Sequence, residues 1–299
     1  KVEDQFSNFQ LNFDRKFGKH AVVAVAGFEA SQRKRPKMWI HSTPVSNAMD
    51  LIRLKEIQEF NDDGNRTEAR MGYLGRINYS YDGKYLLEAN LRADGTSRFR
   101  KGNQWKTFPS FSLGWNVARE HFFEPLNNIV NILKFRASYG LLGNQNTTNW
   151  YQTYQTMSVG SSNGAWLMNG NKPNTASAPG LVSASLTWET IESYNLGLDW
   201  GVFNNRLTGS FDWYIRDTKN MVGNAPELPA LLGTGVPITN NTDLRTSGWE
   251  LSIGWNDRLN NGFTYGAKFN VSDARTKITR YPNNPTKAVS TYIEGRYTN

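Results

Sequence analysis

Four aromatic residues lie in a segment that is otherwise rich in small polar residues. Trp150, Tyr151, Tyr154 and Trp166 fall between residues 143 and 185, among many Gly, Asn, Gln and Ser residues. Such rings can stack on sugar rings while nearby amides and hydroxyls bond to sugar hydroxyls. The mixture predicts a substrate-binding loop. The alternative is a loop whose rings pack on one another or on a partner protein.

A second group of candidate residues carries charge along one segment. Glu88, Asn90, Arg92 and Asp94 occur at every second position between apolar residues. In a β-strand this spacing places all four on one face. Their opposite charges favour an ion-paired wall over separate binding roles.

Catalytic and metal chemistry finds little support in the sequence. His20, His41 and His121 are scattered, and the chain has no H-E-x-x-H motif, nucleophile elbow or phosphate-binding Gly-rich loop. The acidic run from Asp62 to Asn65 lacks the spacing of a calcium loop, so we expect a turn there. The sequence therefore predicts no enzyme, no metal site and no cofactor.

The elements that must position these residues are strands with one apolar and one polar face. In Lys84 to Asp94, for example, Tyr85, Leu87 and Leu91 alternate with the charged group. A period of two is the signature of a half-buried β-strand. The segments of this kind are Phe6 to Phe17, His20 to Glu29, Arg70 to Tyr81, Lys84 to Asp94, Phe108 to Arg119, Ile132 to Leu142, Tyr194 to Val202, Arg206 to Arg216, Trp249 to Asn256 and Phe263 to Ser272.

The connections between these segments alternate between short and long. Three connections contain dipeptides that suit tight turns: Gly18-Lys19, Asp82-Gly83 and Asn204-Asn205. We expect a short helix in the connection from Glu120 to Asn131. In an up-and-down sheet this order places all short connections at one end and all long ones at the other, as in outer-membrane barrels. Strands of about 9 to 11 residues also suffice to cross a bilayer at a tilt of about 45°.

Composition is that of a folded protein without a membrane-spanning helix. Of 299 residues, 38% are hydrophobic and 20% charged, with no cysteine and no long apolar run. The net charge of +8 is spread along the chain, so we expect no nucleic-acid partner. The 39 aromatic residues (10 Trp, 13 Tyr and 16 Phe) include several near segment ends, as in the aromatic girdles of membrane barrels. Lipid or a second sheet must cover the apolar faces, since water opposes their exposure by about 25 cal/mol per Å².

Four longer motifs follow one another along the chain. They are YSYDGKYLLEANLRADGTSRFRKGNQWKTFPSFSLGW from Tyr79 to Trp115, LKFRASYGLLGNQ from Leu133 to Gln145, LTWETIESYNLGLDWGVFNNRLTGSFDWYIRDTKNM from Leu186 to Met221, and SGWELSIGW from Ser247 to Trp255. In this order they resemble the barrel region of SusC/RagA-type TonB-dependent outer-membrane transporters. Gln10 to Glu29 resembles the preceding strand pair. The resemblance implies an all-β, antiparallel up-and-down transmembrane barrel of about 22 strands, of which this chain would supply about ten. We expect residues 1–299 to be part of that barrel domain, with the plug, the N-terminal extension and the last strands outside it.

The resemblance also implies a function. Transporters of this type import oligosaccharides or peptides across the outer membrane of Gram-negative bacteria. A SusD-like lipoprotein caps the external cavity, and TonB supplies energy through the plug. Implied partners are therefore a SusD-like lipoprotein, TonB, outer-membrane lipid and a glycan or peptide. Glu88, Asn90, Arg92 and Asp94 would face the lumen or plug, and the four loop aromatics would lie outside the cell.

Two other classes of protein stay open at this point. A soluble carbohydrate-binding or adhesive β-domain would bury Tyr85, Leu87, Leu91, Phe211 and Trp213 between two stacked layers. A passive porin-like barrel would need neither a plug nor an energy source.

Overall fold

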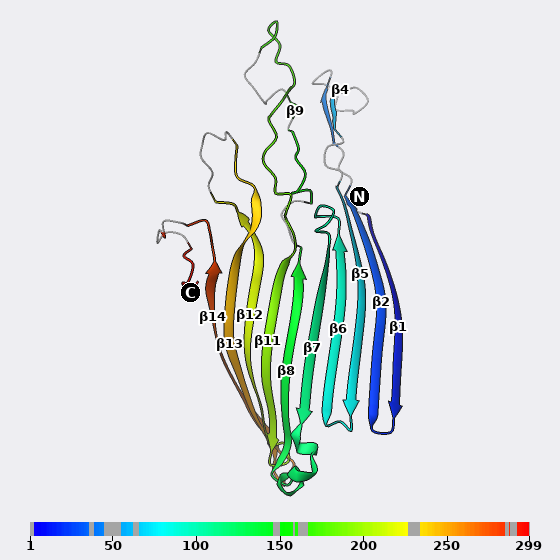
Figure 1. Ribbon diagram of the computed structural model, residues 1–299, viewed down its shortest axis with the longest axis vertical. Helices are drawn as coiled ribbons and strands as arrows, with labels where there is room; N and C mark the ends of the chain where they lie inside the picture. The colour runs from blue at the N-terminus through cyan, green and yellow to red at the C-terminus, as the bar shows by residue number, and fades with distance from the viewer. Residues whose placement is uncertain are drawn as a thin grey trace.

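The protein forms one large antiparallel sheet. The computed structural model describes residues 3–35, 39–44, 55–61, 66–145, 150–157, 159–160, 167–226, 234–284, 287 and 292–298. Ten strands follow one another in the order β1-β2-β5-β6-β7-β8-β11-β12-β13-β14, and each is antiparallel to its neighbour (Figure 1). This confirms the predicted all-β, up-and-down architecture. The sheet is open, with β1 and β14 at its edges.

The strands of this sheet are β1 (Glu3–Phe17), β2 (His20–Arg35), β5 (Arg66–Tyr81), β6 (Tyr85–Thr96), β7 (Trp105–Asn116), β8 (Val130–Asn144), β11 (Glu189–Val202), β12 (Leu207–Asn224), β13 (Ile238–Arg258) and β14 (Thr264–Arg280). Two small separate pairs are β3 (Trp39–Pro44) with β4 (Lys55–Asn61), and β9 (Val159–Gly160) with β10 (Thr175–Ala176). Both pairs lie in long connections.

Short and long connections lie at opposite ends of the sheet, as predicted. Figure 1 shows the turns after β1, β5, β11 and β13 at the lower end, together with the β7–β8 connection. The long connections rise at the upper end, which we call the external end. Asp82 and Gly83 have φ of 54° and 65°, the left-handed values of a type I′ turn, and Lys84 N donates to Tyr81 O at 2.9 Å.

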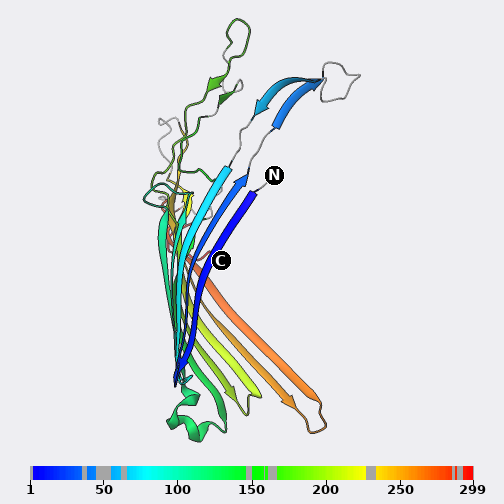
Figure 2. The same ribbon diagram turned by 90° about the vertical axis from the view of Figure 1, so that its right-hand side faces the viewer.

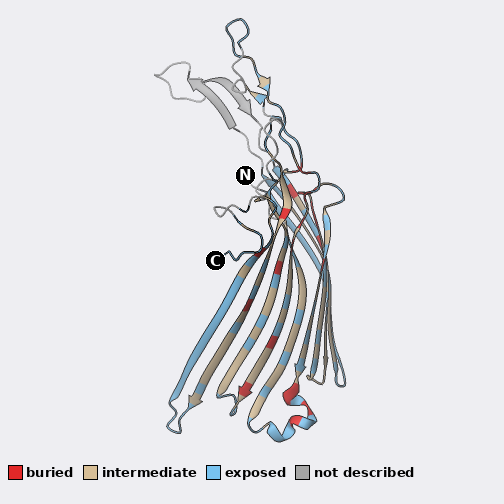
Figure 3. Ribbon diagram, turned by 60° about the vertical axis from the view of Figure 1, so that its left-hand side comes forward, coloured by how far each residue is buried: buried red, intermediate tan, exposed pale blue. Residues whose placement is uncertain are grey.

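One face of the sheet is left uncovered. Tyr85, Leu87, Leu91, Phe211 and Trp213 are between 38% and 55% exposed, and no second layer of described residues packs on them. Figure 2 shows a single curved sheet, and Figure 3 shows that buried residues are few along its strands. We call the side that carries these five residues the outer face, and the other side the inner face. A two-layer sandwich is therefore excluded for the described residues.

The predicted helix between Glu120 and Asn131 is made of 3₁₀ turns. The 3₁₀ helix η3 (His121–Leu126) lies within this segment, and η2 (Val117–Arg119) comes just before it. The prediction that the preceding strand runs to Arg119 was wrong, because Val117 and Ala118 are buried with Phe123 in a small separate cluster. In the described part of the chain, no helix has the length and apolarity that a membrane-spanning helix needs.

Several strands are longer at the external end than the sequence predicted. β13 begins at Ile238 instead of Trp249, and β12 continues to Asn224 instead of ending at Arg216. Residues 239–246 (TNNTDLRT) are polar except for Leu244, so they show no apolar alternation. The backbone of this segment still pairs with β12 and β14, but its sequence has no apolar alternation from which a strand could be predicted.

Candidate functional site

The inner face of β5 and β6 is a ladder of polar contacts. Arg76 donates from Nε to Asn90 Oδ1 at 2.7 Å, and Asn90 donates to Glu88 Oε1 at 2.8 Å. Arg92 donates to Asp94 from Nε, at 2.8 Å to each carboxylate oxygen. The four predicted residues thus share one face and bond to one another and to neighbouring strands.

Two arginines on the inner face form ion pairs between strands. Arg92 Nη2 lies 2.8 Å from Glu29 Oε2 on β2. Arg136 on β8 donates to both oxygens of Asp199 on β11 at 2.9 Å, and to Asp212 on β12 at 3.0 Å. Bidentate contacts of this kind are stronger than single neutral hydrogen bonds and fix the geometry of the pair. Most charges on the inner wall of these strands are therefore neutralised by the wall itself.

The inner face is hollowed. A hollow of about 670 Å³ is lined by Gln10 of β1, Asn90 of β6 and Leu141 of β8, among others. Because β1, β6 and β8 are not neighbours in the sheet, they can border one hollow only if the sheet curves around it. A second hollow of about 550 Å³ lies nearer the external end, between Glu29, Arg92, Trp188 and their neighbours. Both hollows are lined by polar and charged side chains together with a few aromatic ones.

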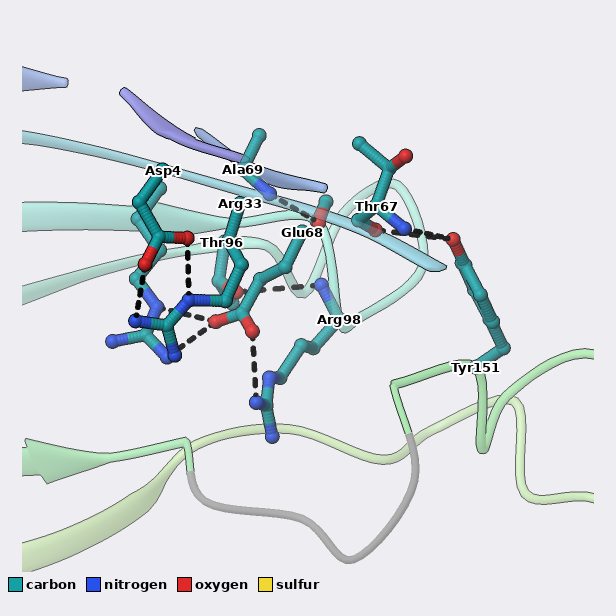
Figure 4. Close-up of polar contacts among 10 residues, drawn as sticks. Asp4, Arg33, Thr67, Glu68, Ala69, Thr96, Arg98 and Tyr151 are labelled. Atoms are coloured by element: carbon teal, nitrogen blue, oxygen red, sulfur yellow. Dashed lines mark hydrogen bonds and ion pairs between the residues drawn. The ribbon is translucent and has the colours of Figure 1, made fainter. Parts of the chain in front are cut away.

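At the external end, one buried carboxylate is bound by two arginines (Figure 4). Arg98 Nη2 donates to Glu68 Oε2 at 2.9 Å, and Arg70 is ion-paired with the other oxygen. Ser97 closes the loop onto β5, since its Oγ accepts from Ala69 N and its N donates to Ala69 O, both at 3.0 Å. The cluster joins the β6–β7 loop to the start of β5.

The pKa of Glu68 depends on two opposing effects, its burial and its bonds to the two arginines. Burial alone would raise it, because burial disfavours the charged carboxylate. The hydrogen bonds from Arg98 and Arg70 outweigh burial and hold the pKa of Glu68 below its ordinary value. Glu68 is therefore ionised at neutral pH and keeps both arginines in place.

Three of the predicted loop aromatics are fixed beside this cluster. The Tyr151 hydroxyl accepts from Thr67 N at 2.9 Å and donates to Thr67 O at 3.1 Å. The Arg35 and Arg98 guanidiniums lie 5.3 and 6.0 Å from the Trp150 ring. The Arg100 guanidinium is 5.9 Å from the Tyr154 ring, within the range of a cation–π contact. Trp166 lies outside the described residues.

Arginine also fixes the backbone of this loop. Arg100 donates from Nε and Nη2 to the carbonyl oxygen of Thr153 at 2.9 and 2.6 Å. Tyr151 and Tyr154 contact each other edge to face, yet each keeps a substantial exposed surface. The loop therefore presents two exposed rings, while the Tyr151 hydroxyl is bonded to Thr67 and the Thr153 carbonyl to Arg100.

A compact apolar core supports the external end. Phe99, Phe108, Leu186 and Trp188 are buried together, and Trp188 Nε1 donates to Gln104 O at 3.1 Å. The Asn240 side chain bonds to both backbone groups of Thr187, each at 2.9 Å. Leu141 of β8 packs in part against this core.

Sequence reasoning missed two central residues of the site. Glu68 and Arg136 stand in segments whose polar residues resemble any other solvated strand face, so no local signal marks them. Within the described residues, no three His, Asp or Glu side chains gather as a metal ion would require.

Comparison with known proteins identifies the family. The model of the TonB dependent receptor-like β-barrel family matches residues 2–299. TonB-dependent receptor P3 of Formosa agariphila is 35% identical over 218 residues, which are 73% of this chain and 21% of that protein. TonB-dependent receptor SusC of Bacteroides thetaiotaomicron is 33% identical over 211 residues, 70% of this chain and 21% of that protein. The chain thus spans about a fifth of the length of these curated relatives.

Solved structures agree on the fold. The alignment with a structure of the RagAB peptide transporter covers 94% of this chain and 30% of that chain, with a TM-score of 0.71 and 22% identity. The outer membrane transporter YddB from Escherichia coli aligns with 95% of this chain and 34% of its own, with a TM-score of 0.59 and 13% identity. The resemblance to SusC/RagA proteins is confirmed, and the chain belongs to the family of TonB-dependent receptor-like β-barrels.

Proposed function

We propose that the chain is part of the barrel wall of an outer-membrane transporter that imports a glycan or peptide with energy from TonB. The observation that carries the proposal is the contrast between the two faces of a single ten-stranded sheet. The outer face is apolar and uncovered, as lipid contact requires, and the inner face is ion-paired and hollowed. The names of its relatives, SusC and the RagAB peptide transporter, support this function.

The proposal includes the partners of the complete transporter. A SusD-like lipoprotein would cap the external end, where the loops are held on a packed core. Glu88, Asn90, Arg92 and Asp94 would face the plug or the lumen, because they lie on the inner face beside the hollows.

Cargo contact is assigned to the exposed loop rings. Tyr151 and Tyr154 keep exposed surface although their loop is fixed by Thr67 and Arg100. Rings that are held before binding lose little freedom on binding. Trp150 and Trp166 belong to the same proposed set.

Uptake by the full-length protein in its native host tests the proposal. The protein should fractionate with the outer membrane, co-purify with a surface lipoprotein and import cargo only while the proton gradient is intact. Uptake that persists with a protonophore would indicate a passive porin. A protein that is soluble without detergent would contradict the membrane barrel itself.

A matched pair of variants tests the cargo loop. Tyr154→Ala should raise the half-saturating cargo concentration about three- to tenfold, the effect of losing one aromatic contact. Tyr154→Phe keeps the ring and should transport normally. Equal uptake by both variants would limit Tyr154 to a structural role.

A further inference from the structure

The β7–β8 connection, Val117 to Ile129, differs from the other connections at its end of the sheet. The turns after β1, β5 and β11 have only a few residues, whereas this one contains η2 and η3 (Figure 1). It also carries three large apolar side chains that no described residue covers. Phe122 is 67% exposed, Leu126 50% and Ile129 53%. Three large exposed apolar side chains between residues 122 and 129 favour contact with an apolar surface.

Two contacts hold this connection against the outer face. Trp115, whose ring is 6.3 Å from that of Phe135, donates from Nε1 to Glu120 Oε1 at 3.1 Å. Val117, Ala118 and Phe123 form a buried cluster against Val130 and Leu133. Trp115 and Phe135 belong to the apolar outer face, as their exposure and cross-strand pairing show, and Leu133 is two residues before Phe135 on the same side of β8. The connection is therefore folded against the apolar side of the barrel wall.

The charge at the base of the connection is neutralised locally. Lys84 Nζ lies 3.3 Å from Glu120 Oε2. Hydrogen bonds from Tyr85 and Trp115 hold the pKa of Glu120 below its ordinary value. Arg119 covers the neighbouring turn so closely that a Cβ on Gly83 would lie 2.0 Å from its Nη1. A carboxylate satisfied by an indole, a phenol and an ammonium suits the boundary between lipid and water, where Trp and Tyr are enriched.

We propose that the β7–β8 connection is an interfacial anchor, with Phe122, Leu126 and Ile129 inserted into the headgroup boundary of the phospholipid leaflet at the short-turn end. The apolar cluster continues the outer face beyond the strand ends, so the same bilayer that covers Leu113 and Phe135 reaches it. His121 and Glu124, which are paired at 2.7 Å and largely exposed, form the water-facing side of η3. The arrangement has the two-sided character of interfacial amphipathic segments. This inference depends on the proposed membrane function.

Spin labels on the full-length protein test the anchor. The 299 residues contain no cysteine, so single labels can be introduced by Phe122→Cys, Leu126→Cys and Glu124→Cys in a background free of other cysteines. Leu113→Cys supplies a reference on the outer face. The protein is reconstituted in vesicles of phosphatidylethanolamine and phosphatidylglycerol, and each label's collision rates with oxygen and with a water-soluble nickel chelate are measured. All four positions are on the surface, and resistance of the barrel to unfolding in cold SDS verifies folding.

The labels at 122 and 126 should have a ratio of oxygen to nickel access several-fold higher than at 124 but below that at 113, which lies deeper in the bilayer. Nickel access at 122 and 126 equal to that at 124, with 113 still in lipid, would overturn the anchor and leave the membrane barrel intact. If those two labels became shielded only in intact cells, a periplasmic protein would be the occupant, and lipid insertion would be wrong. Water access at 113 would overturn the proposed function, and the anchor with it.

Discussion

The Tyr151 hydroxyl bonds to both backbone groups of Thr67, a residue 84 positions earlier in the chain. One side chain thereby supplies Thr67 with the donor and acceptor that a neighbouring strand would offer. The contact ties the aromatic loop to the external end of β5. It also places the loop next to the Glu68 cluster.

Replacing Tyr151 by Phe should release this loop without changing its apolar surface. Each lost hydrogen bond contributes about 1 kcal/mol, so the amide of Thr67 should exchange its hydrogen about five- to thirtyfold faster. Hydrogen-exchange mass spectrometry of the peptide that contains Thr67 measures this. Tyr154→Phe is the control and should leave exchange unchanged. Equal protection in Tyr151→Phe and the native protein would show that the loop is held by other contacts.

The Glu68 cluster should weaken in acid. Because the pKa of Glu68 is lowered in the folded protein, its stabilising effect is complete above its ordinary pKa of 4.5 and is lost as the pH falls through the lower folded-state value. A spin label at Lys101→Cys, in the β6–β7 loop, should become more mobile over that range. Glu68→Gln should give a mobile label at every pH, at a local cost of about 1.5 to 3 kcal/mol.

Glu124→Gln, at the opposite end of the sheet, is the control for general effects of removing a carboxylate. Its label should follow the native pH profile. An acid transition that survives in Glu68→Gln would assign the pH dependence to another group.

Arg136 should be important for the stability of the inner wall. Arg136→Met leaves Asp199 and Asp212 without their shared cation, and all three side chains are partly exposed. We expect a loss of about 1 to 2 kcal/mol, because solvent screens such pairs. The temperature at which the full-length barrel unfolds in SDS measures it. Adding Asp212→Asn should recover part of the loss, whereas no recovery would argue against a purely electrostatic effect.

Two glycines on the outer face should respond differently to alanine. A Cβ on Gly209 would lie 2.2 Å from the Trp200 ring and 2.8 Å from the backbone oxygen of Ser252, so Gly209→Ala should cost about 1 to 3 kcal/mol. Around Gly75 a Cβ would meet nothing within 4 Å, and Gly75→Ala should be neutral or slightly stabilising. Thermal unfolding of the two variants gives the comparison. Similar stabilities would mean that Trp200 has room to move.

The sequence was sufficient for the fold because the physical signal repeats along every strand. Each strand that separates lipid from an aqueous interior must alternate, and Tyr85, Leu87 and Leu91 show this without any knowledge of their partners. Turn residues such as Asp82 and Gly83 then fix the order of short connections. The sheet order follows from those two signals together.

The external end was less predictable because parts of its strands lack an alternating apolar pattern. Thr239 to Thr246 has no apolar period, yet it belongs to a strand. The partners of Glu68 and Arg136 come from other strands or from a loop, and pairing of that kind leaves no local pattern. The loop aromatics were visible from their types, but their arginine and backbone contacts depend on tertiary structure.

The short-turn end also has a consequence for how the sheet assembles. Asp82 N donates to Lys19 O at 2.7 Å, Asn116 N to Lys84 O at 2.7 Å, Phe203 N to Ile129 O at 2.8 Å and Asn256 N to Arg206 O at 2.8 Å. Each hairpin thus offers its successor an acceptor at the point where the chain reverses. A slip of one residue between hairpins would exchange the two faces of a strand and would also break the bond at the turn. The bonds between successive turns therefore help to fix the register of each hairpin relative to its neighbour.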